Sequence, residues 1–247
     1  MVTMKGFFAL VFLLCAGVGL HAADMIRLRD AIYEQRLTAN QVRPIYDEVR
    51  ATVGGMAPGA ARYQALSRAE FFMGRALLFE EREREARTHF AEGLRLAEAA
   101  LALAASAEGW VLRGENLAHL IQVSNWTFAL ANGLDVERFA RNALAINPRN
   151  AAAQYLIAAR WVFAPSPFNN INRGLEMMKA IANGGGDMAR DDRFNVNSAI
   201  GWGYVQQRRY DAAIPWIQRA LEVYPSNRFA SDLLAAAEAG RGGRRAR

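Results

Sequence analysis

The chain has 247 residues, of which 52% are hydrophobic and 22% charged, so it can bury a sizeable core and is not a disordered or low-complexity chain. Alanine is abundant and the β-branched residues are sparse, which excludes a mainly β fold and predicts an all-α one. The formal charge is +6, but Lys5 and the four arginines of residues 241–247 account for five of these charges, so we expect no nucleic-acid-binding face on the rest.

Residues 1–22 have the features of a secretory signal peptide. One lysine precedes an apolar run, residues 6–20, that is shorter than the ~20 residues of a membrane-spanning helix. Small residues follow, and the pattern predicts cleavage after Ala22 and an exported, periplasmic protein. The alternative is a lipoprotein anchored through Cys15, although Leu14 is larger than the residue that usually precedes a lipidated cysteine.

From residue 23 onward, the sequence predicts amphipathic helices separated by glycine and proline. Residues 23–57 form two leading helices, residues 58–240 a helical repeat domain, and residues 241–247 a basic flexible tail. Long turns are expected at 126–133 and 164–171. The predicted helices lie near residues 25–36, 41–53, 60–79, 82–103, 107–124, 134–147, 150–163, 171–182, 194–207, 211–223 and 227–239.

The clearest internal repeat unit is residues 194–227. Gly201 allows the first helix of this unit to approach the second closely, Ala213 lies where the two helices nearly touch, and Ile217 fills the space between them. Pro225 then ends the second helix. This order and spacing resembles the tetratricopeptide repeat (TPR), a helix–turn–helix unit of about 34 residues.

Three more degenerate copies extend the resemblance over about residues 60–240. In the copy that starts near Ser67, Gly74 and Phe90 stand at the spacing of Gly201 and Ile217. The resemblance implies a TPR-like solenoid of antiparallel helix pairs with long inserted turns. The alternative is a plain helical bundle in which Ala-Leu pairs recur through composition.

A second, narrower resemblance concerns two short segments. The Ala-Pro turn that follows ARWVF (residues 159–163) and the YPSN ending of the last copy (residues 224–227) are similar to the accessory repeat protein of periplasmic TRAP transporters. This resemblance implies an accessory role in solute uptake.

The sequence contains few residues suited to catalysis or metal binding. After signal removal no cysteine remains, and His89 and His119 are not at a zinc-binding spacing. Neither GGG (residues 184–186) nor GWG (residues 201–203) follows a strand, which argues against a dinucleotide loop. We therefore expect no metal, no cofactor and no enzymatic activity, with an envelope hydrolase as the least favoured alternative.

In a TPR-like solenoid the first helices line a concave wall that binds extended peptides or helices. We expect a protein or peptide partner there, and non-catalytic scaffolding as the function. The alternative is a small-ligand carrier with a pocket inside the repeat, and self-association stays open. The candidate partner-binding residues are Phe71, Arg75, Arg113, Asn116, Leu156, Arg160, Asn195 and Trp202.

Three of these residues have side chains whose chemistry suits the binding of a partner. Arg75 and Arg160 occupy equivalent repeat positions, where a guanidinium group can form paired hydrogen bonds with a carboxylate. Trp202 can supply a rigid apolar anchor, although tryptophans more often pack between helices.

Overall fold

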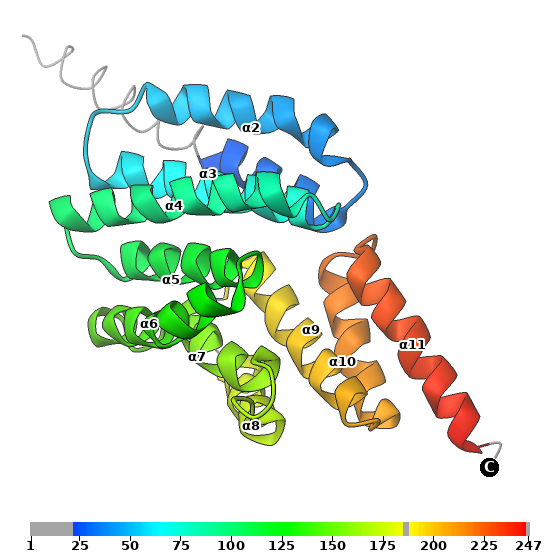
Figure 1. The fold of residues 1–247 in the computed structure, drawn as a ribbon. Helices are drawn as coiled ribbons and strands as arrows, with labels where there is room; N and C mark the ends of the chain where they lie inside the picture. The colour runs from blue at the N-terminus through cyan, green and yellow to red at the C-terminus, as the bar shows by residue number, and fades with distance from the viewer. Residues whose placement is uncertain (1–21, 185–187, 246–247) are drawn as a thin grey trace, which may run out of the picture.

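The computed structural model describes residues 22–184 and 188–245, so Cys15 and the predicted signal peptide up to residue 21 lie outside it. Within these ranges every regular element is an α-helix (Figure 1). A leading helix covers residues 22–34. The following helices are α2 (Ala39–Gly54), α3 (Ala60–Leu78), α4 (Glu83–Leu103), α5 (Ala107–Gln122), α6 (Trp126–Ile146), α7 (Ala151–Phe163), α8 (Ile171–Asn183), α9 (Arg190–Gln206), α10 (Tyr210–Val223) and α11 (Arg228–Arg245).

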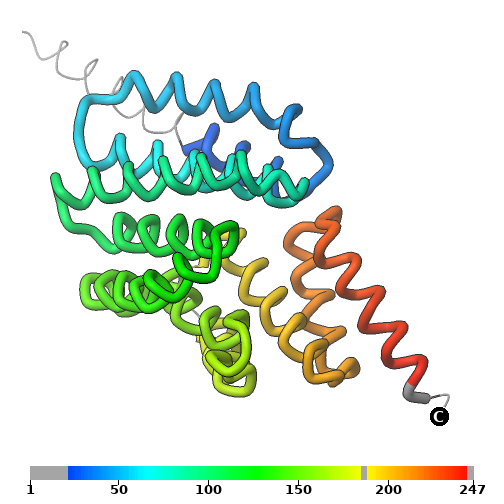
Figure 2. The backbone as a smooth tube through the Cα atoms, in the orientation of Figure 1, coloured from blue at the N-terminus to red at the C-terminus, as the bar shows by residue number. Residues whose placement is uncertain are grey.

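The helices stack in chain order, each against the next, as the smooth trace shows (Figure 2). The predicted pairs are present: α3 packs on α4, α5 on α6, α7 on α8, and α9 on α10. The first helices of successive pairs, α3, α5, α7, α9 and then α11, also contact one another in sequence and form an inner wall. This is the serial packing of a TPR-like helical-repeat solenoid, so the predicted fold class is confirmed.

Glycines set the distance between the helices of two pairs. A Cβ placed at Gly201 on α9 would lie 2.5 Å from the Ile217 side chain on α10, and one at Gly74 on α3 would lie 2.6 Å from the Phe90 ring on α4. A Cβ at either place would force the facing side chain to move, so glycine allows the closest approach of the two helices. The close approaches predicted from the repeat pattern are therefore present in both pairs.

The prediction of a long turn at residues 126–133 is wrong. The Asn125 side chain accepts a hydrogen bond from the Phe128 amide and caps α6, which begins at Trp126 and runs through Gly133. The second long turn is present, between the end of α7 at Phe163 and the start of α8 at Ile171.

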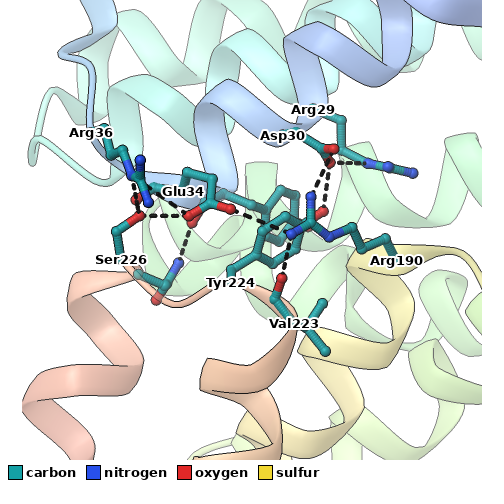
Figure 3. A network of polar contacts seen from close by, with 10 residues as sticks. Arg29, Asp30, Glu34, Arg36, Arg190, Val223, Tyr224 and Ser226 are labelled. Carbon is teal, nitrogen blue, oxygen red and sulfur yellow. Dashed lines mark hydrogen bonds and ion pairs between the residues drawn. The ribbon is translucent and has the colours of Figure 1, made fainter.

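The leading helix joins the two ends of the stack (Figure 3). Asp30 accepts hydrogen bonds from the Arg190 side chain of α9 at 2.9 Å and from the Tyr224 hydroxyl, after α10, at 2.9 Å. The Ser226 hydroxyl donates to the Glu34 backbone carbonyl at 2.7 Å. These contacts join residues 160 to 194 positions apart and hold the leading helix against α9 and the turn after α10, so that it closes the inner wall.

The C-terminal helix is longer than expected. It continues to Arg245, so residues 241–245 are helical rather than part of a flexible tail. Gly240 packs against the Tyr210 ring of α10, whereas a Cβ placed at Gly242 or Gly243 would meet no atom within 4 Å outside the backbone of its own helix.

Candidate functional site

The inner wall contains a small cavity of about 100 Å³. It lies between the end of α3, helices α7 and α9, and the start of α11, where five aromatic side chains meet five other residues. We call it the inner pocket. Its lining residues are Arg75, Phe79, Tyr155, Phe163, Phe194, Asn195, Ser198, Ala199, Asn227 and Phe229.

Arg75 is the cationic group of the inner pocket. Its guanidinium carbon lies 5.1 Å from the ring centre of Tyr33 on the leading helix and 5.0 Å from that of Phe79. Its Nη1 atom donates to Nε2 of His119 at 3.2 Å, while its buried Nε atom has no hydrogen-bond partner. No carboxylate among the described residues pairs with Arg75.

The histidine beside Arg75 does not neutralise it. His119 Nδ1 lies 2.9 Å from the backbone carbonyl of Glu115, and since a carbonyl only accepts, Nδ1 carries the proton and Nε2 accepts from Arg75. Burial and, to a lesser extent, the Arg75 charge lower the pKa of His119 to about 3. The ring is therefore neutral at physiological pH and leaves the Arg75 charge without a counter-ion in the described structure.

Two more polar side chains of the pocket lie on α9. Ser198 is buried, and its hydroxyl oxygen has no hydrogen-bond partner. The Asn195 amide nitrogen donates to the Tyr33 hydroxyl at 3.1 Å, so the leading helix supports this wall. The pocket thus gathers a charged donor and a free hydroxyl from two different helices.

The mouth of the inner pocket is aromatic. Phe163, the last residue of α7, and Phe229, in the first turn of α11, line the pocket with 43–44% of their surface exposed. Trp202 on α9 packs against Phe163, with ring centres 5.0 Å apart. An apolar part of a bound molecule that extends out of the pocket would cover these exposed rings.

Four of the eight predicted partner-binding residues gather in this region. Arg75 and Asn195 line the inner pocket. Phe71 is buried beside Arg75, whose guanidinium carbon lies 6.0 Å from its ring centre, and Trp202 supports the mouth through Phe163.

The structure places the other four elsewhere. Asn116 is fully buried and donates to the Ser67 hydroxyl and the Leu112 carbonyl, and Leu156 is buried against Gly114. Arg113 binds Glu98 at 2.9 Å, and Arg160 binds Glu137 at 2.5 Å. That these four residues bind a partner stays a prediction.

Sequence reasoning did not single out several residues of the pocket. Ser198 stands three residues after Asn195, on a similar face of the same helix, so helical periodicity would have pointed to it. Phe79 and Phe229 lie at the ends of helices, and no local pattern predicts that these ends meet.

A separate apolar surface lies on α6. Trp126, Leu130 and Leu134 are spaced four residues apart and form one stripe, and the Phe168 ring, from the turn after α7, lies 6.1 Å from that of Trp126. All four side chains are between 47% and 67% exposed. We call these four residues the α6 patch. The expected turn at residues 126–133 did not predict this patch.

The structure also has an open groove of about 520 Å³ between the end of α8, α9 and α10. Arg193, Arg219 and Trp216 line it together with Glu222, and the Arg219 guanidinium carbon lies 4.5 Å from the Trp216 ring centre. Its wall is more polar than that of the inner pocket.

An ion-pair cluster joins α3 to α5. Arg68 binds Glu115 at 2.5 Å and Glu108 at 2.7 Å. Burial raises the pKa of Glu115 to about 7, although the Arg68 charge lowers it, and burial together with Asp191 raises the pKa of Asp192 to about 6. None of these acids lines the inner pocket or the open groove.

Across the described ranges, no group of three or more histidine, cysteine or acidic side chains is placed to hold a metal ion. None of the described helices combines the length and the apolar character that crossing a bilayer requires.

No family model and no curated protein matches the sequence. Among solved structures, the chain is similar to the TPR protein YrrB, whose crystal structure is described as having an unusual peptide-binding site; the TM-score is 0.35 with 14% identity, over 78% of this chain and 82% of YrrB. Likeness at this level carries no argument about ligands, and the helix packing described above is what assigns the chain a TPR-like helical-repeat fold.

Proposed function

We propose that this protein is a non-catalytic binding protein that docks a protein partner on the α6 patch. The observation that carries the proposal is the patch itself: four large apolar side chains, contributed by α6 and the turn after α7, lie together and exposed. Contiguous apolar surface of this kind on a folded domain is typical of interaction sites. A TPR-like scaffold commonly serves this purpose.

The shape of the patch indicates the kind of partner. The two ends of the stripe, Trp126 and Leu134, are eight positions apart on the helix, or roughly 12 Å at 1.5 Å per residue. This length matches two turns of a partner helix that presents apolar residues three and four positions apart. We therefore propose a partner with an exposed amphipathic helix.

The test compares two surface variants. The double variant Leu130→Glu/Leu134→Glu places charges on the patch, and because both side chains are exposed the fold should be retained. Leu103→Glu is the matched control, since Leu103 is 60% exposed at the end of α4, outside the patch. Affinity capture from envelope extract should recover a stoichiometric partner with the wild type and Leu103→Glu but not with the double variant.

Two results would contradict this proposal. Equal recovery by all three proteins would show that the partner binds elsewhere. Light scattering of the purified protein that shows a dimer, lost only in the double variant, would assign the patch to a second copy of the chain.

We also propose that the chain is exported to the periplasm and assists a TRAP-type solute-uptake system. The apolar run of residues 6–20 behind a lysine supports export, and the segments 159–163 and 224–227 support the second part through their resemblance. N-terminal sequencing of the protein from a periplasmic extract should begin at residue 23. A lipid-modified N-terminus that Cys15→Ala removes would instead show an anchored lipoprotein.

A second candidate function is that of a small-ligand carrier, and the inner pocket favours it. The pocket combines aromatic walls with an unpaired cation and a free hydroxyl, which is the arrangement of a small-molecule site. The leading helix closes the inner wall on which an extended peptide was expected. Native mass spectrometry of the purified protein should detect a bound small molecule if this function holds.

A further inference from the structure

The inner pocket holds hydrogen-bond donors that no acceptor satisfies. Within the described residues, the buried Nε of Arg75 and the hydroxyl of Ser198 lack partners, and both residues line the same cavity. A buried polar group without a partner is costly, and a bound molecule that accepts hydrogen bonds in this cavity would satisfy both groups. The neutral His119 ring accepts from Arg75 but supplies no negative charge.

These donors define the polar end of that ligand. A carboxylate only accepts hydrogen bonds, and it can accept one from the Arg75 Nε–H while a second contact comes from the Ser198 hydroxyl. One guanidinium group balances one negative charge. A monoanion therefore fits the pocket better than a phosphate ester, whose second charge would stay unpaired.

The other walls define the rest of the ligand. Phe79, Phe194 and Ala199 make the interior apolar, and Phe163 and Phe229 are partly exposed at the mouth. The volume of about 100 Å³ is smaller than a benzene-binding cavity of about 150 Å³, so a carboxyl group and a few carbons fill it. A longer apolar tail would extend over the two exposed rings.

We infer that the inner pocket binds a free monocarboxylate with an apolar tail, held by Arg75 and Ser198. This inference rests on the carrier function proposed above and names the ligand class of that site. The free small molecule is favoured over a peptide terminus because the leading helix packs across the inner wall beside Arg75.

The experiment uses the full mature chain and isothermal titration calorimetry. Octanoate and phenylacetate are the charged probes, and octanol and phenylacetamide are their neutral counterparts. We expect at least one charged probe to bind about tenfold more tightly than its neutral counterpart, since a charge-assisted hydrogen bond would be lost. Arg75→Lys should weaken binding of the charged probe by about tenfold, because lysine lacks the planar guanidinium geometry.

Two variants separate binding from folding. Ser198→Ala removes a hydroxyl that has no partner in the protein, so it should leave thermal stability unchanged and still weaken octanoate binding about threefold. Arg113→Lys is the matched control: Arg113 also has a buried Nε without a partner but pairs with Glu98 outside the pocket, so binding should not change.

The outcomes distinguish the inference from the function on which it rests. If no probe binds and no small molecule accompanies the purified protein, the carrier function itself is overturned. If the neutral probes bind as tightly as the charged ones and Arg75→Lys has no effect, the carrier function stands and the carboxylate assignment fails. A tripeptide ending in phenylalanine that binds more tightly than phenylacetate, through Arg75, would show a peptide terminus in place of the free molecule.

Discussion

His119 shows how the interior changes the chemistry of a single side chain. The sequence places it between Ala118 and Leu120 and predicts a half-buried structural histidine rather than a metal ligand or a base. In the structure it donates to the Glu115 carbonyl and accepts from Arg75, so it orients the cation of the inner pocket. Its role is that of a positioning residue.

The protonation of His119 makes stability depend on pH. Burial lowers its pKa in the folded protein to about 3, below the ordinary 6.5, so as pH falls below 6.5 the unfolded chain takes up a proton that the folded protein refuses. The stability is present above pH 6.5 and is lost toward pH 3, by at most about 1.4 kcal/mol per pH unit. Urea unfolding of the wild type and His119→Gln at pH 7, 6 and 5 measures this: Glu115 and Asp192 titrate in both proteins, so the wild type should lose stability relative to the variant as pH falls. If the free energy of unfolding depended on pH in the same way in both proteins, the His119 ring would not be neutral and buried in the folded protein.

At the scale of the helices, glycine has opposite roles at the contact between α9 and α10 and inside α6. Gly201 faces the Ile217 side chain at the contact between α9 and α10, and a Cβ there would force that side chain to move. Gly133 lies in the middle of α6 with nothing within 4 Å of the position where a Cβ would stand. The repeat pattern predicted the first role, whereas the second glycine was interpreted as a helix breaker.

These two glycines give a matched pair of substitutions. Gly133→Ala should stabilise the protein by about 0.5–1 kcal/mol, because alanine loses less backbone entropy in a helix. Gly201→Ala makes the same gain but forces the Ile217 side chain aside, which costs about 1–3 kcal/mol, so the net effect should be destabilising. Urea unfolding measures both values. A stabilising Gly201→Ala would mean that α9 and α10 are not in close contact.

The error at α6 has a local physical cause. Glycine is a poor helix former, so Gly133 predicted a break near that point. The Asn125 cap and the four-residue spacing of Trp126, Leu130 and Leu134 were the signals for a helix that starts earlier. The α6 patch could therefore have been found from the sequence.

At the scale of the whole molecule, the leading helix joins the first and last parts of the stack. Asp30 accepts from Arg29, Arg190 and Tyr224, which come from the leading helix, α9 and the turn after α10. Asp30→Ala should lower the free energy of unfolding by roughly 2–3 kcal/mol, because it removes hydrogen bonds to charged groups.

A control and a local measurement make this prediction specific. Asp232→Ala changes an exposed acid on α11 and should leave stability unchanged. Hydrogen exchange should become faster in residues 223–230 of Asp30→Ala and stay unaltered in the control. Unchanged exchange there, together with unchanged stability, would show that the leading helix does not hold the two ends together.

The sequence by itself determined most of the helices, their pairing and the repeat order, because these depend on local propensity, on the spacing of small and large residues within one unit, and on glycine and proline at its ends. It also placed Arg75 and Asn195 on first helices that face inward. Only the tertiary structure decided that the leading helix closes the wall, that Phe79 and Phe229 meet at one cavity, and that Arg160 finds an acid while Arg75 does not. These features depend on the small rotations between successive helix pairs, which accumulate along the stack and bring together residues up to about 200 positions apart. The accumulated rotation cannot be predicted from any local sequence pattern.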